Sequence, residues 1–372
     1  MGSIHKTPYF FRSKPLFGLD IGKSSLKVVQ LAQIEAKQPT KKVKDNTQNP
    51  YELKLIGYGT ASFDPAAIVD GVIVQPEVIA KAAQELFKKQ LIGDITTSQV
   101  ALSIPSYRTF TRSIELPVLQ PRERTEAVRL EAEQYIPMPL DEMYLDYTVI
   151  TETTEAMTVL AVAVPRDIVD SYLQLTALMG LEAVLVESTM SAVGRMFSHD
   201  IQSDVTSVVI DFGTMSSDIS IYDHGILTTG TVEGGGQVFT NAIEKKLAVS
   251  ASEAAIIKTK YGLGLSKRQK EIQTALDPTL QRIVKEVKRL ERYYNERYGA
   301  DRPIQQVITL GGGGNMPGLS DYLTSELRLA ARTCDLWNYV DLSGLQPPST
   351  IDRSMYATAM GLALAPPTGV FK

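Results

Sequence analysis

The sequence predicts an α/β fold made of two similar halves with a ligand cleft between them. An apolar strand, an Asp-x-Gly turn and a second strand occur near the start of the chain, in "PLFGLDIGKSSLKVVQLAQ" (15–33). The same pattern returns far downstream, in "SVVIDFGTMSSDISIYDHG" (207–225). Further strand and helix patterns follow each copy, so each half repeats one plan, and a duplicated α/β domain is the simplest architecture.

Composition limits the class of protein. The 372 residues are enough for two domains, and 44% hydrophobic with 22% charged residues is typical of a soluble globular chain. A net charge of −4 argues against nucleic acid as a partner. The single cysteine, Cys334, cannot form an internal disulfide, and no run of about 18 apolar residues predicts a transmembrane helix. We therefore expect a cytoplasmic protein, and if it works at a membrane, another protein must hold it there.

The first half begins after a polar and aromatic segment, 1–14, which we interpret as a flexible N-terminal arm. The strand after the first turn runs into the Lys-rich segment 35–50, interpreted as a solvated hairpin tip, and "YELKLIGYGTAS" resumes the strand pattern. The spacing of apolar residues in "QPEVIAKAAQELFKKQL" (75–91) predicts an amphipathic helix.

A different pattern follows. Between "SQVALSIPS" and "VLVES" the order is strand, strand, helix, strand, strand, helix, strand. This alternation is typical of a compact α+β module, so we expect an insert within the first half.

The second half starts with its own Asp-x-Gly turn and continues into the Gly-rich turn "EGGGQVF" and a helical region that reaches about residue 299. The segment "QQVITLGGGGNMPGLSDYL" predicts a strand, a glycine turn and a helix. The segment "SMYATAMGLALA" predicts a closing helix of small residues.

The paired turns suggest phosphate chemistry. A tight turn between strands can direct backbone N–H groups at a phosphate, and small or hydroxyl residues allow close approach. An aspartate beside the turn would hold Mg²⁺ through water, and the ion would neutralise the phosphates. The residues of the two turns are then Asp20, Gly22, Ser24 and Ser25 in one, and Asp211, Gly213 and Thr214 in the other. Such hairpins also occur for purely structural reasons.

Two glycine runs add to this pattern. Gly311, Gly312, Gly313 and Gly314 follow the buried strand "QVITL" and cost backbone entropy, which favours close approach of a ligand. The alternative is a tight strand-to-helix packing turn. The run Gly234, Gly235 and Gly236 supports either interpretation equally.

The two Asp-x-Gly turns and the glycine run at 311–314, in this order along the chain, resemble the actin-like ATPase superfamily. The nucleotide cleft of that superfamily has two phosphate loops and a glycine-rich adenosine loop. The resemblance implies an α/β, duplicated actin-like (ribonuclease-H-like) ATPase fold. The place of the insert implies an FtsA-type inserted α+β subdomain. The segment "LEAEQYIPMPLDEMYLDYTVI" (130–150) is similar to the signature of the PilM family, actin-like proteins of type IV pilus machines.

This resemblance implies a division of the chain. The first actin-like domain would comprise 15–97 and 186–204, with 352–366 as its closing helix. The inserted, 1C-type subdomain would span 98–185, and the second actin-like domain 205–351, with about 234–300 as its smaller helical subdomain.

The resemblance also implies ATP with Mg²⁺ as the ligand, held at Asp20 and Asp211 through water. Lys23 stands in the first phosphate loop where relatives place Ser or Thr, and Glu187 stands where a water-positioning residue is expected. The nucleoside would lie near the two glycine runs and near Lys258, Glu286 and Arg289. Alternatively, Glu187 is a glutamate favoured at a helix N-terminus and Arg289 a surface charge. Because no other residue stands out as a water activator, we expect slow ATP hydrolysis at most.

The implied partner is the N-terminal cytoplasmic peptide of a PilN-like inner-membrane protein, with Tyr135, Ile136 and Pro137 at the binding surface. The other interpretation of these three residues is a helix end packed on a strand. Two different functions stay open from the sequence, an FtsA-like filament former and a sugar-kinase-type phosphotransferase, as does self-association.

Overall fold

The structure is a computed structural model, and it describes residues 15–35, 51–200, 203–298 and 302–365. The predicted N-terminal arm and nearly all of the predicted hairpin tip at 35–50 lie outside these residues.

The first half is built on a sheet with the strand order β11-β7-β1-β2-β3. The pair β1–β2 is antiparallel and forms the first hairpin, and β1 also pairs with β7 in parallel. Short strands β6 and β17 pair with β3. The strands span Phe17–Ile21 (β1), Ser25–Glu35 (β2), Tyr51–Ser62 (β3), Ile92–Gly93 (β6), Gln99–Ile104 (β7), Glu182–Ser188 (β11) and Val340–Asp341 (β17). A separate two-strand ladder joins Ile68–Val69 (β4) and Val72–Ile73 (β5).

The second half repeats this topology. Its sheet has the order β14-β13-β12-β15-β16, with β12–β13 as the antiparallel second hairpin and β12–β15 as a parallel pair. The strands span Ser207–Phe212 (β12), Ser216–Tyr222 (β13), Ile226–Glu233 (β14), Gln306–Leu310 (β15) and Ala330–Thr333 (β16). The predicted duplication is therefore confirmed strand by strand.

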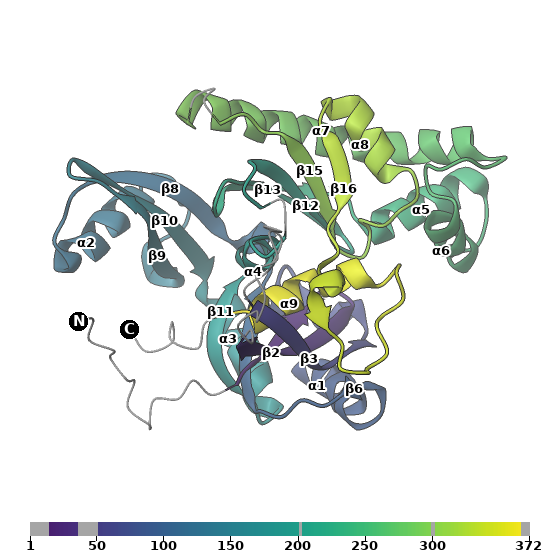
Figure 1. The fold of residues 1–372 in the computed structure, drawn as a ribbon, viewed down its shortest axis with the longest axis horizontal. Helices are drawn as coiled ribbons and strands as arrows, with labels where there is room; N and C mark the ends of the chain where they lie inside the picture. Colours follow the sequence, from purple (N-terminus) through teal and green to yellow (C-terminus); the bar gives the residue numbers. More distant parts are fainter. Residues whose placement is uncertain (1–14, 36–50, 201–202, 299–301, 366–372) are drawn as a thin grey trace, which may run out of the picture.

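Helices lie on both faces of each sheet (Figure 1). On one face of the first sheet, α1 (Pro76–Glu85) and α3 (Arg166–Leu178) share a core with it. Between the two sheets lie α4 (Thr189–Phe197) and α9 (Ala357–Ala363), whose core includes strands of both halves. The outer face of the second sheet carries the remaining helices of that half: α5 (Gly236–Leu247), α6 (Ala251–Lys260), α7 (Gln269–Tyr298) and α8 (Leu319–Leu327).

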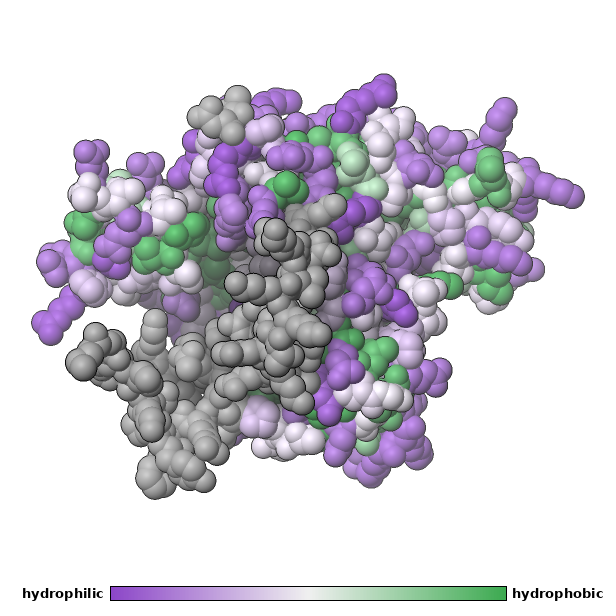
Figure 2. All heavy atoms as spheres, in the orientation of Figure 1, coloured by the Kyte–Doolittle hydropathy of each residue, from purple (hydrophilic) through white to green (hydrophobic). Residues whose placement is uncertain are grey.

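Hydrophilic residues dominate the face of the molecule seen in Figure 2, and hydrophobic residues gather in small areas, one of them over the insert. None of the helices in the described residues is long and apolar enough to cross a bilayer.

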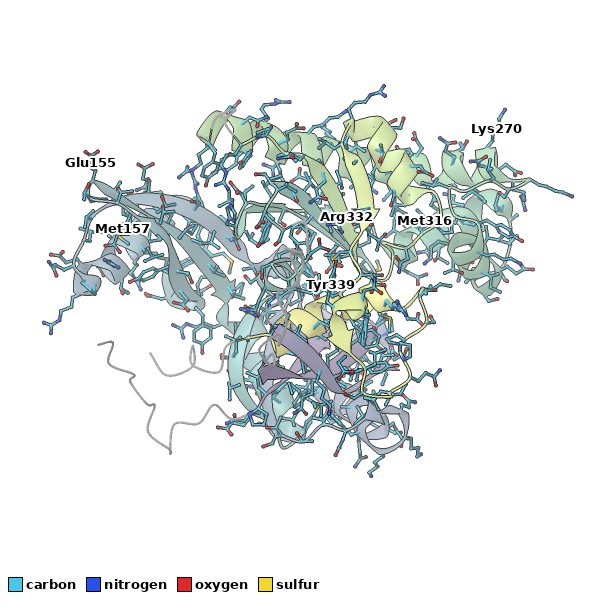
Figure 3. All side chains as sticks on the ribbon, viewed as in Figure 1. Glu155, Met157, Lys270, Met316, Arg332 and Tyr339 are labelled. Atoms are coloured by element: carbon cyan, nitrogen blue, oxygen red, sulfur yellow. The ribbon has the colours of Figure 1, made fainter. Side chains whose placement is uncertain are left out.

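The insert is a separate sheet, β8-β10-β9, covered on one face by α2. Its elements span Phe110–Pro117 (β8), Pro121–Ala132 (α2), Met143–Glu152 (β9) and Ala156–Pro165 (β10). It extends from the body of the molecule, and Glu155 marks its outer tip (Figure 3). The predicted order of elements is confirmed, but the range 98–185 is too wide. Strands β7 and β11 pair within the first sheet and α3 packs on it, because their apolar residues complete that core.

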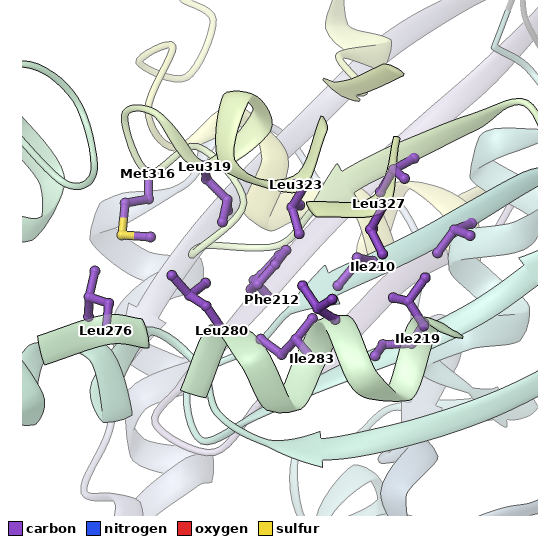
Figure 4. Packing of buried hydrophobic residues seen from close by; sticks show 14 of the residues in the cluster. Ile210, Phe212, Ile219, Leu276, Leu280, Ile283, Met316, Leu319, Leu323 and Leu327 are labelled. Carbon is purple, nitrogen blue, oxygen red and sulfur yellow. The ribbon is translucent and has the colours of Figure 1, made fainter. Parts of the chain in front are cut away.

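The core of the second half shows why its helical segment folds as it does. Along α7, buried residues recur at helical spacing, including the predicted stripe of Ile283, Val287, Leu290 and Tyr294. Figure 4 shows this face of α7 packed against Ile210, Phe212 and Ile219 of the second hairpin and against α8. This packing anchors the second hairpin to α7 and α8.

Candidate functional site

One cavity of about 650 Å³ lies between the two hairpins. This volume is in the usual range for small-molecule sites. The first hairpin, the second hairpin, the glycine turn after β15 and the start of α5 all contribute to its wall. Most of the predicted site residues line it: Asp20, Gly22, Lys23, Ser25, Asp211, Gly213, Thr214, Gly236, Lys258, Gly311, Gly312 and Gly313. The structure thus joins segments that are nearly 300 positions apart in the sequence.

In the first hairpin, Asp20 already has a cation. Lys27, directly opposite on β2, donates from Nζ to Asp20 Oδ2 at 2.9 Å, and Ser103 of β7 donates to Oδ1 at 2.9 Å. Both side chains of the ion pair are nearly buried. The turn itself closes with the Gly22 N–H donating to the Ser25 carbonyl at 2.9 Å. Asp20 is therefore neutralised within the protein, unlike the free metal-side carboxylate that the sequence predicted.

The second hairpin has the opposite charge: two aspartates face each other, without a lysine. Asp211 on β12 stands directly opposite Asp218 on β13. Burial raises the pKa of Asp211 to about 7, the carboxylates of Asp218 and Asp20 add to the rise, and Lys27 opposes it. Burial also raises the pKa of Asp218 to about 6, although the Thr231 hydroxyl donates to it and lowers the value. Facing like charges are unfavourable, so this pair favours a bound cation.

Lys27 and Asp218 are site residues that the sequence reasoning missed. Each lies seven positions after the aspartate of its turn, and each lines the cavity. The signal was available, because antiparallel strands joined by a short turn place residues at a fixed offset directly opposite each other.

The glycine turn after β15 allows close approach between parts of the protein. Gly311 has φ of +77°, and a Cβ on it would lie 2.1 Å from Asp211 Oδ1. Gly314 is also needed for packing, because a Cβ there would lie 2.4 Å from the Leu310 carbonyl oxygen. Gly312 differs, since a Cβ would meet no atom closer than 3.9 Å. Gly311 and Gly314 therefore fit the packing interpretation, whereas Gly312 has room beside it at the cavity wall.

The glycines at 234–236 also differ in their surroundings: two pack against the protein and one lines the cavity. Cβ atoms on Gly234 and Gly235 would lie 2.4 Å from Thr279 and from the Gly213 carbonyl oxygen, respectively, and neither glycine lines the cavity. Gly236 does line it, and its N–H donates to the Gly213 carbonyl at 2.8 Å. Lys258 donates to the Gly236 carbonyl at 2.7 Å, and burial lowers the pKa of this lysine. Helix α5 and the second hairpin are thereby joined at the cavity.

Lys23 lines the cavity, but its ammonium donates to the carbonyl oxygens of Pro65 and Ile68. Ser24 does not line the cavity.

Three other predicted residues lie outside the cavity wall. Glu187 forms a bidentate ion pair with Arg195 of α4, with an Nη2–Oε2 distance of 2.7 Å, and Arg195 also donates to the Gly361 carbonyl. Glu286 and Arg289 pair with each other on α7 against Gly230 of β14. The structure thus engages each of these charges in a contact within the protein.

The residues predicted at the partner surface have different environments. Ile136 is buried in the insert core with Ala132 and Leu140, just after the end of α2. The Tyr135 ring is half-buried beneath Arg112, whose guanidinium carbon lies 4.8 Å from the ring centroid. Pro137 is exposed. Only Pro137 is therefore fully presented at the surface, and Ile136 has the packing role.

Comparison with solved structures shows the fold. A PilM–PilN type IV pilus biogenesis complex matches with a TM-score of 0.78 and 22% identity, over 97% of this chain and 100% of that chain. The ethanolamine utilization protein EutJ from Carboxydothermus hydrogenoformans matches with a TM-score of 0.51 and 16% identity, over 94% of this chain and 88% of EutJ. MreB5 of Spiroplasma citri bound to AMPPNP matches with a TM-score of 0.50 and 14% identity, over 94% of this chain and 95% of the MreB5 chain. The fold is that of the actin-like ATPases.

Sequence comparison shows the family. The family model described as type IV pilus assembly protein PilM matches residues 18–366, which include both hairpins, the insert and the closing helix. The chain belongs to the PilM family of type IV pilus assembly proteins.

Proposed function

We propose that this chain is an ATP-binding adaptor of the type IV pilus assembly machinery. It would bind nucleotide between the two hairpins and, through the insert, the N-terminal cytoplasmic peptide of a PilN-like inner-membrane protein. The observation that carries the proposal is the meeting of two equivalent Asp-x-Gly hairpins at one cavity in a chain of the PilM family. Such an adaptor would act in the cytoplasm, at the inner face of the membrane, and its partner would hold it there.

The cavity fits a nucleoside polyphosphate. Lys23, Lys27 and Lys258 line it and supply positive charge. Cβ atoms on Gly22 and Gly236 would meet no atom closer than 3.4 Å, and one on Gly312 none closer than 3.9 Å, so the cavity wall is not crowded at these glycines. The helix that begins at Gly236 adds a dipole that favours an anion.

A Mg²⁺ ion fits the second hairpin. Among the described residues, no group of three or more His, Cys, Asp or Glu could hold a metal by itself. Mg²⁺ commonly takes one or two carboxylates together with substrate phosphates and water, and Asp211 with Asp218 meet that description. When bound, the ion would neutralise phosphate charge. Hydrolysis would be slow at most, because Glu187 is held by Arg195.

The insert offers an edge for an extended peptide. Strand β9 pairs with β10, and no described strand pairs with its other side. Tyr144, Asp146, Thr148 and Ile150 are exposed along it, and Asp141 and Glu142 are exposed just before it. Unpaired strand edges bind extended peptides through the backbone. Cytoplasmic segments next to membrane helices are rich in Lys and Arg, so an acidic edge is complementary to such a tail.

The nucleotide part of the proposal predicts that Asp211→Ala weakens binding of a fluorescent ATP analogue with Mg²⁺ about tenfold or more, equivalent to ~1.4 kcal/mol or more. The cause is the loss of a carboxylate that holds the ion. Titration by fluorescence anisotropy checks this, with the exposed Asp321→Ala as the matched control. Binding of equal strength by wild type and Asp211→Ala would reject the assignment of the second hairpin to the phosphates.

The partner part predicts that a Lys/Arg-containing N-terminal peptide of a PilN-type protein binds, and that Asp146→Lys weakens binding by about fivefold or more through repulsion, a loss of ~1 kcal/mol. The control is Glu155→Lys, the same charge reversal at the outer tip of the insert (Figure 3). Isothermal titration calorimetry measures both variants. If both reversals weaken binding equally, general charge rather than the β9 edge attracts the peptide.

A further inference from the structure

The loop at 261–268, between α6 and α7, exposes apolar residues at the end of the molecule opposite the insert (Figure 1). Leu265 is 93% exposed, Ile256 on α6 is 59% exposed and Tyr261 is 38% exposed. A leucine this exposed projects from the surface and does not line a groove. Single exposed apolar residues are ordinary, whereas a group of them indicates an interaction surface.

The loop is held to the protein, so the exposure of Leu265 is a property of the fold. Leu263, two positions earlier, is buried in the core of the second half, and its N–H donates to the Pro317 carbonyl at 2.7 Å. The Gly264 N–H donates to the Tyr261 carbonyl at 2.8 Å, and this tight turn brings the backbone of Leu265 close to Tyr261. Leu263 thus anchors the loop, and Leu265 projects into solvent.

Lysines accompany these apolar side chains. Lys260 stands four positions after Ile256, on the same face of α6, and its ammonium nitrogen lies 5.4 Å from the centroid of the Tyr261 ring. Lys267 and Lys270 are exposed in the loop and just after it. None of these three lysines forms an ion pair with another of the described residues. Their charges are therefore available to an external anion.

The acidic residues of this region are engaged locally. Glu271 pairs with Arg268 at 3.0 Å, and Glu253 accepts from the Ser250 N–H at the start of α6. From 244 to 271 the chain has seven basic and three acidic residues, a net charge of +4, although the whole chain carries −4. This end of the molecule is thus basic and apolar within an acidic chain.

The α6 surface consists of Ile256, Lys260, Tyr261, Leu265, Lys267 and Lys270. We propose that it binds the anionic face of a lipid bilayer directly. Projecting apolar side chains enter the boundary between headgroups and acyl chains, and lysines beside them attract anionic lipids. Tyrosine is favoured at this depth, and a lysine stem can lie along apolar surface while its ammonium stays among the headgroups. A deformable bilayer accepts a projecting leucine, whereas a protein partner would have to supply a matching pocket.

This contact goes beyond the proposed function and needs neither nucleotide nor peptide. A few apolar side chains with a few lysines bind a membrane weakly and reversibly, so the contact adds to a membrane partner and does not replace it. Glu155 of the insert and Lys270 of the α6 surface lie at opposite ends of the molecule (Figure 3). A partner bound at the insert and lipid bound at the α6 surface would therefore place the long axis along the bilayer.

Co-sedimentation of the full chain with lipid vesicles measures the contact. The wild type is expected to bind vesicles that contain phosphatidylglycerol and not vesicles of phosphatidylcholine alone, and added salt should weaken binding because it screens the lysines. Leu265→Ser should weaken binding about tenfold or more, since the leucine no longer leaves water. Lys260→Gln/Lys267→Gln should weaken it about tenfold or more, through the loss of two charges near the lipid surface.

Each variant has a matched control on the first half. Leu178 is 54% exposed at the end of α3, and Lys81 and Lys88 are exposed in α1 and just after it. Leu178→Ser and Lys81→Gln/Lys88→Gln should therefore bind vesicles as the wild type does. The substituted residues of the α6 surface are exposed, so the melting temperatures of those variants should stay close to that of the wild type.

Insertion of the loop has a readout of its own. The native Trp337 is buried and contributes a constant background to the fluorescence. In Leu265→Trp, anionic vesicles should shift the added emission to shorter wavelengths, because the indole ring leaves water. An unchanged spectrum would show that the loop does not enter the bilayer and would overturn the inference.

The inference is also overturned if the wild type does not bind anionic vesicles, or if Leu265→Ser binds them as tightly as the wild type does. Self-association that Leu265→Ser abolishes, measured by analytical ultracentrifugation without vesicles, would assign the α6 surface to a second copy of the chain instead. Binding of ATP and of the peptide is measured without lipid, so failure of the lipid contact leaves the proposed function intact.

Discussion

Gly361→Ala is expected to destabilise the whole chain by about 3 kcal/mol or more, because overpacking against a rigid backbone cannot be relieved by a side-chain rotation. A Cβ on Gly361 would lie 1.9 Å from the carbonyl oxygen of Ala192 on α4. The same helix approaches the first sheet equally closely, since a Cβ on Gly18 of β1 would lie 2.1 Å from the Ala359 carbonyl oxygen. Helix α9 is thus held by backbone contact on two sides.

The effect should extend across the molecule, because α4 and α9 belong to the core that the two halves share. Chemical denaturation followed by circular dichroism measures the loss of stability. The matched control is Gly312→Ala, the same change where a Cβ meets nothing closer than 3.9 Å, with an expected effect within about 0.5 kcal/mol. Similar stability of both variants would show that α9 can shift and that the close approach is not required.

Gly312→Leu is expected to weaken ATP binding about 100-fold or more, equivalent to ~2.7 kcal/mol, with little loss of stability. Gly312 lines the cavity and is exposed to it, so a leucine side chain would occupy space that the ligand needs. The effect should grow with side-chain size from alanine to valine to leucine.

The measurement is a nucleotide titration paired with a thermal melt of each variant. A loss of affinity that follows size while the melting temperature stays nearly constant would place the ligand against Gly312. Wild-type affinity in Gly312→Leu would place the ligand elsewhere in the cavity. A companion variant, Gly311→Ala, separates the two roles of the glycine run. It should destabilise the fold, because φ is +77° and the Asp211 carboxylate occupies the place of the Cβ.

The strand-turn-strand units were readable because their information is local. An alternating apolar pattern, an Asp-x-Gly turn and a second strand lie within about 20 residues, and turn geometry depends on these residues themselves. The closing helix of small residues was readable for the same reason. The physical cause of its small residues, contact with the backbones of α4 and β1, became visible only with the packing.

The boundary of the insert could not be read in this way. Strand β7 has the apolar character expected of either sheet, and its membership depends on which neighbour it pairs with in space. The role of Glu187 was hidden for a related reason, because its partner Arg195 is eight positions away and the carbonyl that completes the contact belongs to α9. The function of a charged residue in a motif depends on whether its side chain is free or already paired within the protein, and the motif alone does not show which.

The sequence by itself determined that the chain has two equivalent halves, where their hairpins turn, which glycines interrupt regular structure and which family signature the insert carries. These properties depend on residue type and spacing along the chain. Only the tertiary structure decided which glycines face the cavity and which face the protein, and that Asp20 is paired with a lysine while Asp211 faces a second aspartate. Those distinctions arise from contacts across strands and between halves, where the distance between two charges, rather than their order in the chain, sets their energy.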